Sequence, residues 1–268
     1  LLLLLLLLLL GYSQMGVLPL LVLVLMLALA GCAAPNGGLV GVHANDTHAY
    51  YGGLLAGNGK IYAIPATAAG VLVIDPQTNA VDTTTLCCFD DQTHKWNGGV
   101  LANNGKVYTV PHTANHVLIF DPITNVTDTT TLTGFGSGTG KWHHGVLALN
   151  GRIYTVPYSA TFVLIIDPET NATHTSSISN LGSGGKWVTG VVASHRIFCV
   201  PYFDESVLTI DTATNTFDRS TITGLTGGDK WTDAALGPDG KVYGIPGTAY
   251  IVCVCVCVCV CVCVCVCV

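Results

Sequence analysis

Charged side chains are scarce in this sequence. Asp, Glu, Lys and Arg together make up 10% of its 268 residues, and the net charge is −6. Nucleic-acid-binding proteins carry a basic patch on their surface. The ten Lys and Arg residues of this sequence are instead scattered along the chain. We therefore expect no nucleic-acid partner.

Motifs for metals, phosphates and nucleophiles are also lacking. None of the twelve cysteines has the Cys-x-x-Cys or Cys/His spacing of a zinc site. No phosphate-binding loop and no nucleophile motif occurs. We expect no metal and no cofactor, and a binding protein is favoured over an enzyme. The adjacent Cys87 and Cys88 are interpreted as two free thiols rather than a vicinal disulfide.

Helical periodicity is absent from the central part of the chain, which instead repeats itself. A Lys-Trp pair recurs at Lys95, Lys141, Lys186 and Lys230, and an earlier copy begins at Ala49 with Tyr50 in place of Trp. The spacings are 46, 46, 45 and 44 residues. A fixed period of this size predicts a β-propeller with one blade per repeat.

The copy at 95–140 shows what one blade contains. Four segments predict strands: the short apolar run 98–102, the β-branched and aromatic run 107–110, the apolar run 117–120 and the Thr-rich run 126–132. Asn104-Gly105 predicts a hairpin turn, Pro111 ends the second strand, and Asp121-Pro122 predicts a turn. We expect an all-β fold of four-stranded blades, four full and one partial. The Lys-Trp loops and the loops after each Pro should share one face.

These patterns divide the chain into four parts. Residues 1–32 are poly-Leu followed by an apolar helix that serves as a signal peptide or an anchor, and 33–48 hold a candidate closing strand. The repeats occupy 49–250, as 49–94, 95–140, 141–185, 186–229 and the partial copy 230–250. Residues 251–268 alternate Val and Cys and form a low-complexity tail that reads like translated simple-sequence DNA. A lipid on Cys32 is a further alternative. We expect a secreted protein, or one anchored to a membrane by the N-terminal segment.

Two recurring side chains have structural interpretations that compete with functional ones. Asp recurs at the third turn, where it bonds its own backbone, and a calcium-binding ring is the alternative. Trp recurs at the start of each copy, where packing between blades is favoured and contact with a ligand is the alternative. The residues are Asp75, Asp121, Asp167 and Asp211, and Trp96, Trp142, Trp187 and Trp231.

The positions that differ between copies are the better candidates for recognition. Residues after each Trp and after each Pro vary and should lie on one rim, where exposed-loop drift is the plain alternative. The candidates for ligand binding are His112, His143, His144, Tyr158, Tyr202, Asp204, Glu205 and Asp233, together with the four Trp residues.

Three Asn-x-Thr sequons are candidate glycosylation sites in a secreted chain. They begin at Asn45, Asn125 and Asn171. The last two fall at the Asp-Pro turn, where Asn is also an ordinary turn residue.

The repeat resembles those of Kelch-like, NHL-like and YVTN-type propellers over about residues 49–250. The resemblance rests on Asn-Gly-Lys-Val-Tyr-x-Val-Pro and Val-Leu-Ile-x-Asp-Pro-x-Thr-Asn. Trp precedes Gly-Gly here, whereas Kelch repeats place Tyr and Trp after it. Some similar propellers are metal-dependent lactonases or lyases with ligands on the inner strands. The inner strands here offer one Asp and few His, which argues against such a centre.

The sequence therefore predicts a non-catalytic binding or scaffold propeller whose loop face holds a protein, peptide or glycan. One alternative is a metal-dependent, lactonase-like hydrolase or lyase. Another is a fragmentary gene model without a defined activity.

Overall fold

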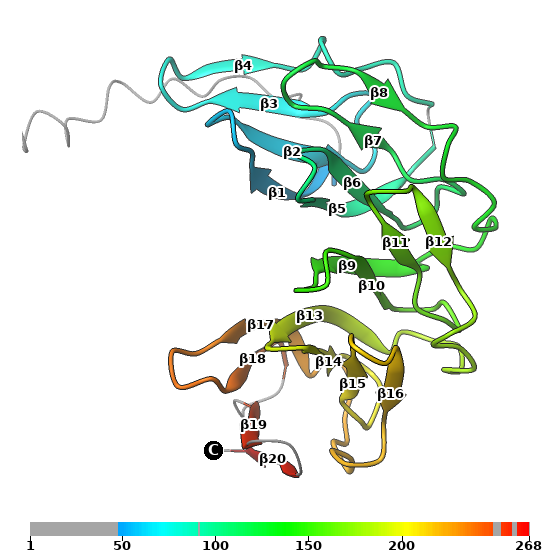
Figure 1. Cartoon of the computed structure of the whole chain (residues 1–268), viewed down its shortest axis with the longest axis vertical. Helices are drawn as coiled ribbons and strands as arrows, with labels where there is room; N and C mark the ends of the chain where they lie inside the picture. The colour runs from blue at the N-terminus through cyan, green and yellow to red at the C-terminus, as the bar shows by residue number, and fades with distance from the viewer. Residues whose placement is uncertain (1–47, 91, 249–252, 259–261, 268) are drawn as a thin grey trace, which may run out of the picture. The chain divides into compact units, whose positions relative to one another are not determined.

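The computed structural model describes residues 48–90, 92–248, 253–258 and 262–267, with backbone alone in the last two ranges. All of these residues belong to one compact unit, residues 45–268. They form five four-stranded antiparallel sheets, and the strands of each sheet are paired in chain order (Figure 1). The expected all-β fold of repeated blades is confirmed.

The strand bounds follow the repeat. Sheet 1 contains β1 (Tyr50–Leu55), β2 (Ile61–Pro65), β3 (Leu72–Asp75) and β4 (Ala80–Asp82). Sheet 2 contains β5 (Trp96–Leu101), β6 (Val107–Pro111), β7 (Ile119–Phe120) and β8 (Thr127–Asp128). Sheet 3 contains β9 (Trp142–Leu147), β10 (Ile153–Pro157), β11 (Ile165–Asp167) and β12 (Ala172–His174). Sheet 4 contains β13 (Trp187–Ala193), β14 (Arg196–Pro201), β15 (Leu208–Asp211) and β16 (Thr216–Asp218). Sheet 5 contains β17 (Trp231–Leu236), β18 (Val242–Pro246), β19 (Cys253–Val258) and β20 (Val262–Cys267).

The predicted N-terminal helix, the closing strand and Cys32 lie outside the described residues. Within the described part of the chain, no helix is long and apolar enough to cross a membrane. The Val-Cys tail, expected as low-complexity sequence, supplies β19 and β20. β19 pairs with β18, with Val242 opposite Cys255, and β20 pairs with β19, so the tail takes the place of repeat-derived outer strands.

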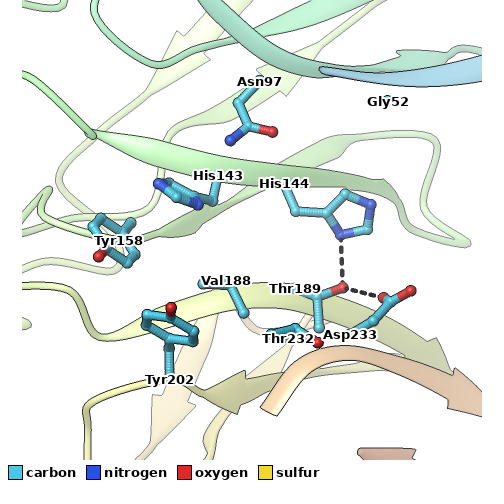
Figure 2. A pocket seen from close by; sticks show the side chains of 10 residues that line it. All are labelled: Gly52, Asn97, His143, His144, Tyr158, Val188, Thr189, Tyr202, Thr232 and Asp233. Atoms are coloured by element: carbon cyan, nitrogen blue, oxygen red, sulfur yellow. Dashed lines mark hydrogen bonds between the residues drawn. The ribbon is translucent and has the colours of Figure 1, made fainter. Parts of the chain in front are cut away.

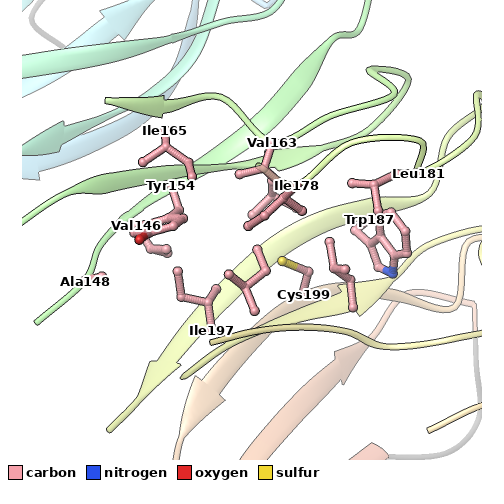
Figure 3. Close-up of a cluster of buried hydrophobic side chains, with 13 residues drawn as sticks. Val146, Ala148, Tyr154, Val163, Ile165, Ile178, Leu181, Trp187, Ile197 and Cys199 are labelled. Atoms are coloured by element: carbon pink, nitrogen blue, oxygen red, sulfur yellow. The ribbon is translucent and has the colours of Figure 1, made fainter. Parts of the chain in front are cut away.

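Successive sheets pack face to face through apolar side chains. The innermost strand of each sheet contacts that of the next, from β1 through β5, β9 and β13 to β17. One buried cluster joins Val146, Tyr154 and Ile165 of sheet 3 to Ile197 and Cys199 of sheet 4 (Figure 3). Glycine on the inner strand is needed for this fit, because a Cβ on Gly145 would lie 2.8 Å from Val110 Cγ2 of the preceding sheet.

The lysine before each Trp is buried, which the sequence interpretation missed. The exposed fractions are 0, 6, 4 and 3% for Lys95, Lys141, Lys186 and Lys230. Lys141 Nζ donates to the carbonyls of Thr113 (3.0 Å) and Gly138 (2.9 Å), and so connects sheet 2 to the loop that leads into sheet 3. The other three lysines make equivalent bonds to backbone carbonyls. The hydrogen bonds of each ammonium group therefore connect one sheet to the next, at the end where the inner strands begin.

A second connection lies at the opposite ends of the strands. Asn104 Nδ2 and the Tyr108 hydroxyl both donate to the carbonyl of Pro168 in the next sheet, at 2.9 and 3.1 Å. Asn58 with Tyr62 and Asn150 with Tyr154 repeat the arrangement at the neighbouring junctions. We call this pair the Asn–Tyr contact. Sheet 4 has Ser194 and Phe198 at these positions and cannot form it.

The recurring Asp residues serve the turns in the structure. Asp121 Oδ1 accepts the backbone N–H groups of Ile123 (2.8 Å) and Thr124 (3.2 Å). Asp75 and Asp211 accept equivalent pairs, and Asp167 accepts the N–H of Glu169. These carboxylates therefore bond the backbone of their own turns, as the structural interpretation expected.

Cys87 and Cys88 form a vicinal disulfide, so the preference for free thiols was wrong. Cys88 has φ of 71° in the left-handed region. The equivalent residues of sheets 2, 3 and 4 are Gly134, Asn180 and Gly224, all with positive φ. The backbone of this loop thus takes the same path in four sheets, and the first sheet does so with Cys in place of Gly or Asn.

Candidate functional site

A break in strand register places the candidate side chains. In every sheet the pairing of the first two strands shifts just after the first residue of the inner strand. Such a bulge re-aims the side chains beside it. The residues affected are the two that follow Trp, for example His143 and His144 in sheet 3. The five bulges lie at equivalent positions, so these residues can meet at one site.

A pocket of about 500 Å³ lies where they meet (Figure 2). This size suits a small organic ligand. Every sheet contributes to its lining, mostly through the two residues after Trp, and Tyr158 and Tyr202 reach it from the loops after Pro. The lining residues are Gly52, Asn97, His143, His144, Tyr158, Val188, Thr189, Tyr202, Thr232 and Asp233.

Hydrogen bonds connect three sheets along one wall of the pocket. Thr189 Oγ1 lies 3.2 Å from His144 Nδ1 and donates to Asp233 Oδ1, also at 3.2 Å, as the dashed lines in Figure 2 show. The backbone N–H of Gly190 donates to His144 Nδ1 at 3.2 Å. An atom that accepts this bond carries no proton. Burial also lowers the pKa of His144, although Asp233 opposes the shift. His144 is therefore a neutral imidazole with its proton on Nε2.

Two further imidazoles form a hydrogen bond with each other beside this wall. His112 Nε2 lies 3.2 Å from His143 Nε2, so one ring donates to the other. Burial lowers the pKa of each to about 4, and the neighbouring His94 and His112 add repulsion for His112 and His143 respectively. Both rings are neutral at pH 7. His112 Nδ1 is buried and finds no hydrogen-bond partner in the described part of the chain.

Aromatic rings continue from this pair across neighbouring sheets. His143 stacks on Tyr158 with ring centroids 4.0 Å apart, and Tyr158 lies 6.1 Å from Tyr202. Tyr202 in turn makes an edge contact with Phe203 at 4.7 Å. On the other side, His94 lies 6.0 Å from His112. One row of rings thus runs from His94 to Phe203, and three of its members, His143, Tyr158 and Tyr202, line the pocket.

The structure brings together five of the twelve residues predicted to bind a ligand. Five line the pocket, and His112 supports it through His143. Asp204 and Glu205 instead line a separate hollow of about 780 Å³ with Arg219. The carboxylate of Asp204 accepts from Arg219 at 2.8 Å and so is already paired. The five pocket residues are His143, His144, Tyr158, Tyr202 and Asp233.

The four Trp residues do not belong to the site. Their exposed fractions are between 0 and 3%. The indole N–H of Trp142 donates to the carbonyl of Phe162 at 2.9 Å, and Trp96 and Trp187 make equivalent bonds. Their proposed contact with a ligand is therefore corrected, because the rings are enclosed between sheets.

Thr189 is the residue that sequence reasoning missed. It occupies the same place in its repeat as His144 and Asp233, two residues after Trp. That alignment was the signal, since equivalent residues of adjacent blades face one another. Asn97, Val188 and Thr232 occupy the other variable position and also line the pocket.

The sequons differ in their surroundings. Asn45 lies outside the described residues. Asn125 is exposed, whereas the Asn171 side chain accepts a hydrogen bond from the Tyr108 hydroxyl at 2.9 Å. Both have left-handed backbones, with φ of 58° and 53°. Among the described residues, no group of three or more His, Cys, Asp or Glu is placed to hold a metal ion.

Comparisons with known proteins show the fold. No protein-family model matches the sequence, and no curated protein matches it. Among solved structures, virginiamycin B lyase from Staphylococcus aureus aligns with a TM-score of 0.62 at 12% identity, over 78% of this chain and 67% of the lyase. A catalytically inactive His-to-Ala variant of that lyase has been solved with quinupristin.

Two bacterial neighbours have other roles. The extracellular domain of a protein described as a hybrid two-component system from B. thetaiotaomicron aligns with a TM-score of 0.56 at 14% identity, over 74% of this chain and 26% of that one. An auxiliary nutrient binding protein from Bacteroides ovatus aligns with a TM-score of 0.52 at 14% identity, over 76% and 54%. The chain thus spans only part of each neighbour. Enzymes and binding proteins share this architecture, and the chain is a β-propeller repeat protein.

Proposed function

We propose that this protein is a non-catalytic binding propeller that holds its ligand in the pocket where the inner strands begin. One observation carries the proposal. Side chains that pack the blades recur from copy to copy, whereas those that differ converge on one pocket of about 500 Å³. Variation confined to one face of a constant scaffold is typical of recognition surfaces.

The protonation of His144 favours binding over catalysis. A general base needs a free lone pair within reach of the proton that it removes. The lone pair of His144 is engaged by the N–H of Gly190, and its other nitrogen carries a proton. The ring therefore offers a hydrogen-bond donor to a ligand.

The binding proposal can be tested by filling the pocket without changing its polar wall. Gly98 has φ of 75°, and a Cβ there meets nothing within 4 Å. Gly98 follows the lining residue Asn97 and holds the position that His144 and Asp233 hold in their sheets. Asn tolerates this backbone, so Gly98→Asn should fold and add a side chain beside the pocket. Gly134→Asn, at positive φ in an outer loop, is the matched control. Ligands would be sought by saturation-transfer NMR of the full chain with mixed soluble oligosaccharides and peptides. Binding lost only in Gly98→Asn supports the proposal, and equal binding in both variants contradicts it.

A lyase or hydrolase is the second candidate, and the paired imidazoles favour it. His143 lines the pocket and its pKa of about 4 keeps it neutral and able to accept a proton near pH 7. The test is turnover of quinupristin and of simple lactones by the full chain, with metal analysis of the same sample. Turnover lost in His143→Gln, or stoichiometric metal whose removal lowers stability, would overturn the binding proposal.

We also propose that the protein is secreted and glycosylated. The likeness to an extracellular domain and the apolar residues 17–30 support secretion. The exposed Asn125 is the sequon that should be used, because Asn171 is engaged with Tyr108. Enzymatic deglycosylation of protein secreted from eukaryotic cells should lower its mass, and Asn125→Gln should abolish most of that shift. Unchanged glycosylation in Asn125→Gln would contradict this assignment.

A further inference from the structure

The formal charges of the pocket restrict its ligand. Asp233 is the only Asp, Glu, Lys or Arg among the lining residues. The nearby lysines direct their ammonium groups to backbone carbonyls within the blade junctions. An anionic ligand would thus meet a carboxylate and no cation to pair with it, a combination that opposes binding.

The wall formed by sheets 3 to 5 offers both a donor and an acceptor. His144 has its proton on Nε2, because Nδ1 accepts from Gly190. Asp233 Oδ1 accepts from Thr189 and from the backbone N–H of Ala234 (2.8 Å), which leaves Oδ2 available. A cationic ligand could pair with Asp233, but it could not accept a hydrogen bond from the imidazole N–H of His144. A ligand that carries hydroxyl groups can use both, since a hydroxyl donates and accepts.

The side of the pocket formed by sheets 1 and 2 leaves room for a bulky part of the ligand. Sheets 1 and 2 have Gly52 and Gly98 where sheets 3 to 5 have His144, Thr189 and Asp233. Both glycines have positive φ, and a Cβ on Gly98 would project into open space. Tyr158 and Tyr202 line the pocket, with their ring centroids 6.1 Å apart. The pocket therefore has a hydrogen-bonded polar wall on sheets 3 to 5, a roomier side with the Asn97 amide on sheets 1 and 2, and two tyrosines in its lining.

We propose that the ligand is a neutral saccharide, held by hydroxyl groups that donate to Asp233 Oδ2 and accept from His144 Nε2–H. This inference rests on the proposed binding function and assigns its ligand class. Thr189 is a positioning residue, because its hydroxyl holds the carboxylate of Asp233 in place. The tyrosine rings supply the apolar surface that the C–H groups of a sugar ring need.

The test is calorimetric titration of the full chain with oligosaccharides of mannose, galactose and N-acetylglucosamine. Sialyllactose and glucosamine oligomers serve as the anionic and cationic probes. We expect one neutral series to bind, and Asp233→Asn to weaken its binding about tenfold, as for the loss of a hydrogen bond to a charged group. Thr189→Val keeps the shape of Thr and should weaken binding about threefold, less than loss of the carboxylate itself. Glu205→Gln removes the same charge outside the pocket and should leave affinity unchanged.

The outcomes separate the two proposals. Tighter binding of either charged probe, or equal weakening by Glu205→Gln and Asp233→Asn, overturns the saccharide assignment. If peptides bind and Gly98→Asn blocks them while no saccharide binds, the saccharide assignment fails and the binding function stands. If quinupristin or a lactone is turned over through His143 and no saccharide binds, both proposals fail. Circular dichroism of each variant establishes that a loss of binding is not a loss of fold.

Discussion

The junctions between the first four blades differ from the junction between the fourth and the fifth. Each of the first three has a buried lysine at one end of the strands and an Asn–Tyr contact at the other. The last keeps Lys230 but has Ser194 and Phe198 where the Asn–Tyr contact would begin. The fifth sheet has no counterpart of the Asp-Pro turns, or of Asp211-Thr212 in sheet 4, to receive such a contact, because the Val-Cys tail supplies its outer strands. Donor and acceptor of the Asn–Tyr contact are therefore both absent at this junction. At that end Phe198 instead packs with Val242 in an apolar cluster, so only the lysine end keeps its polar junction contact.

The largest effect should come from the lysines. Lys141→Met removes an ammonium from the carbonyls of Thr113 and Gly138, and we expect a loss of about 3 kcal/mol in the free energy of unfolding. Urea unfolding measures this loss. Lys230→Met is the comparison, and it should mainly increase hydrogen exchange in β17 and β18, since in a repeat array each interface contributes locally. Equal losses of global stability in the two variants would show that the junctions are equivalent.

The Asn–Tyr contact should contribute less. Tyr154→Phe removes the bonds from the hydroxyl to Asn215 Oδ1 (2.6 Å) and the Thr212 carbonyl, and should cost about 1 kcal/mol in unfolding free energy. Tyr243→Phe is the matched control in the fifth sheet, where the hydroxyl donates to Asp239 within the same blade. Thermal unfolding should show a lower midpoint for the first variant and almost none of that change for the second. Equal unfolding midpoints for Tyr154→Phe and Tyr243→Phe would show that the Asn–Tyr contact does not stabilise the junctions.

Low pH should distinguish the sheets whose outer strand ends at an Asp from sheet 3, whose outer strand ends at His174. Burial raises the pKa of Asp128, but hydrogen bonds from Thr131 and Thr130 outweigh it and lower the pKa to about 2. A carboxyl whose pKa is depressed by folding stabilises the protein above its unfolded pKa of about 4, and this contribution is lost as the pH falls to about 2. Asp128→Asn should therefore be less stable than the parent at pH 7 and equal to it near pH 2. His174→Asn, in the sheet without the carboxyl, should show no such convergence in acid titrations followed by circular dichroism.

The smallest effect is expected in the first blade. Cys88 has the left-handed backbone that Gly134 and Gly224 have in other blades. Cys88→Gly removes the disulfide and the strained side chain together, so opposing terms should leave the melting temperature within a few degrees of the parent. A large fall would mean that the disulfide, rather than the backbone shared with the other blades, holds this loop.

Much of this architecture could be predicted because the same strand and turn signals recur in every copy of the repeat. The hairpin order, the Asp turns and the burial of Trp followed from residues that recur at fixed spacing. The lysines were missed because an ammonium is ordinarily solvated. Their recurrence before every Trp was the available signal, and only the structure shows the carbonyls around Lys141.

The site was predictable only in part. His143 and Asp233 were found because they differ between copies at one rim. Thr189 was missed because its role depends on His144 and Asp233, which are 45 and 44 residues away in sequence. Asp204 was included for its position in a loop, but Arg219 pairs with it in a separate hollow. Such pairings depend on which blades are neighbours in space and on how side chains are aimed, and spacing alone does not give them.

The Asn–Tyr contact also sets an order of events during synthesis. The carbonyl that Tyr108 needs belongs to Pro168, 60 residues later, and that of Tyr62 belongs to Pro122, again 60 residues later. A ribosome therefore releases each blade with a hydroxyl and an amide that stay in water until the following blade emerges. The Asn–Tyr contacts therefore form in order from the N-terminus towards the C-terminus, each after the following blade has been translated. The series ends at Phe198, which has no hydroxyl and needs no carbonyl from the residues that follow.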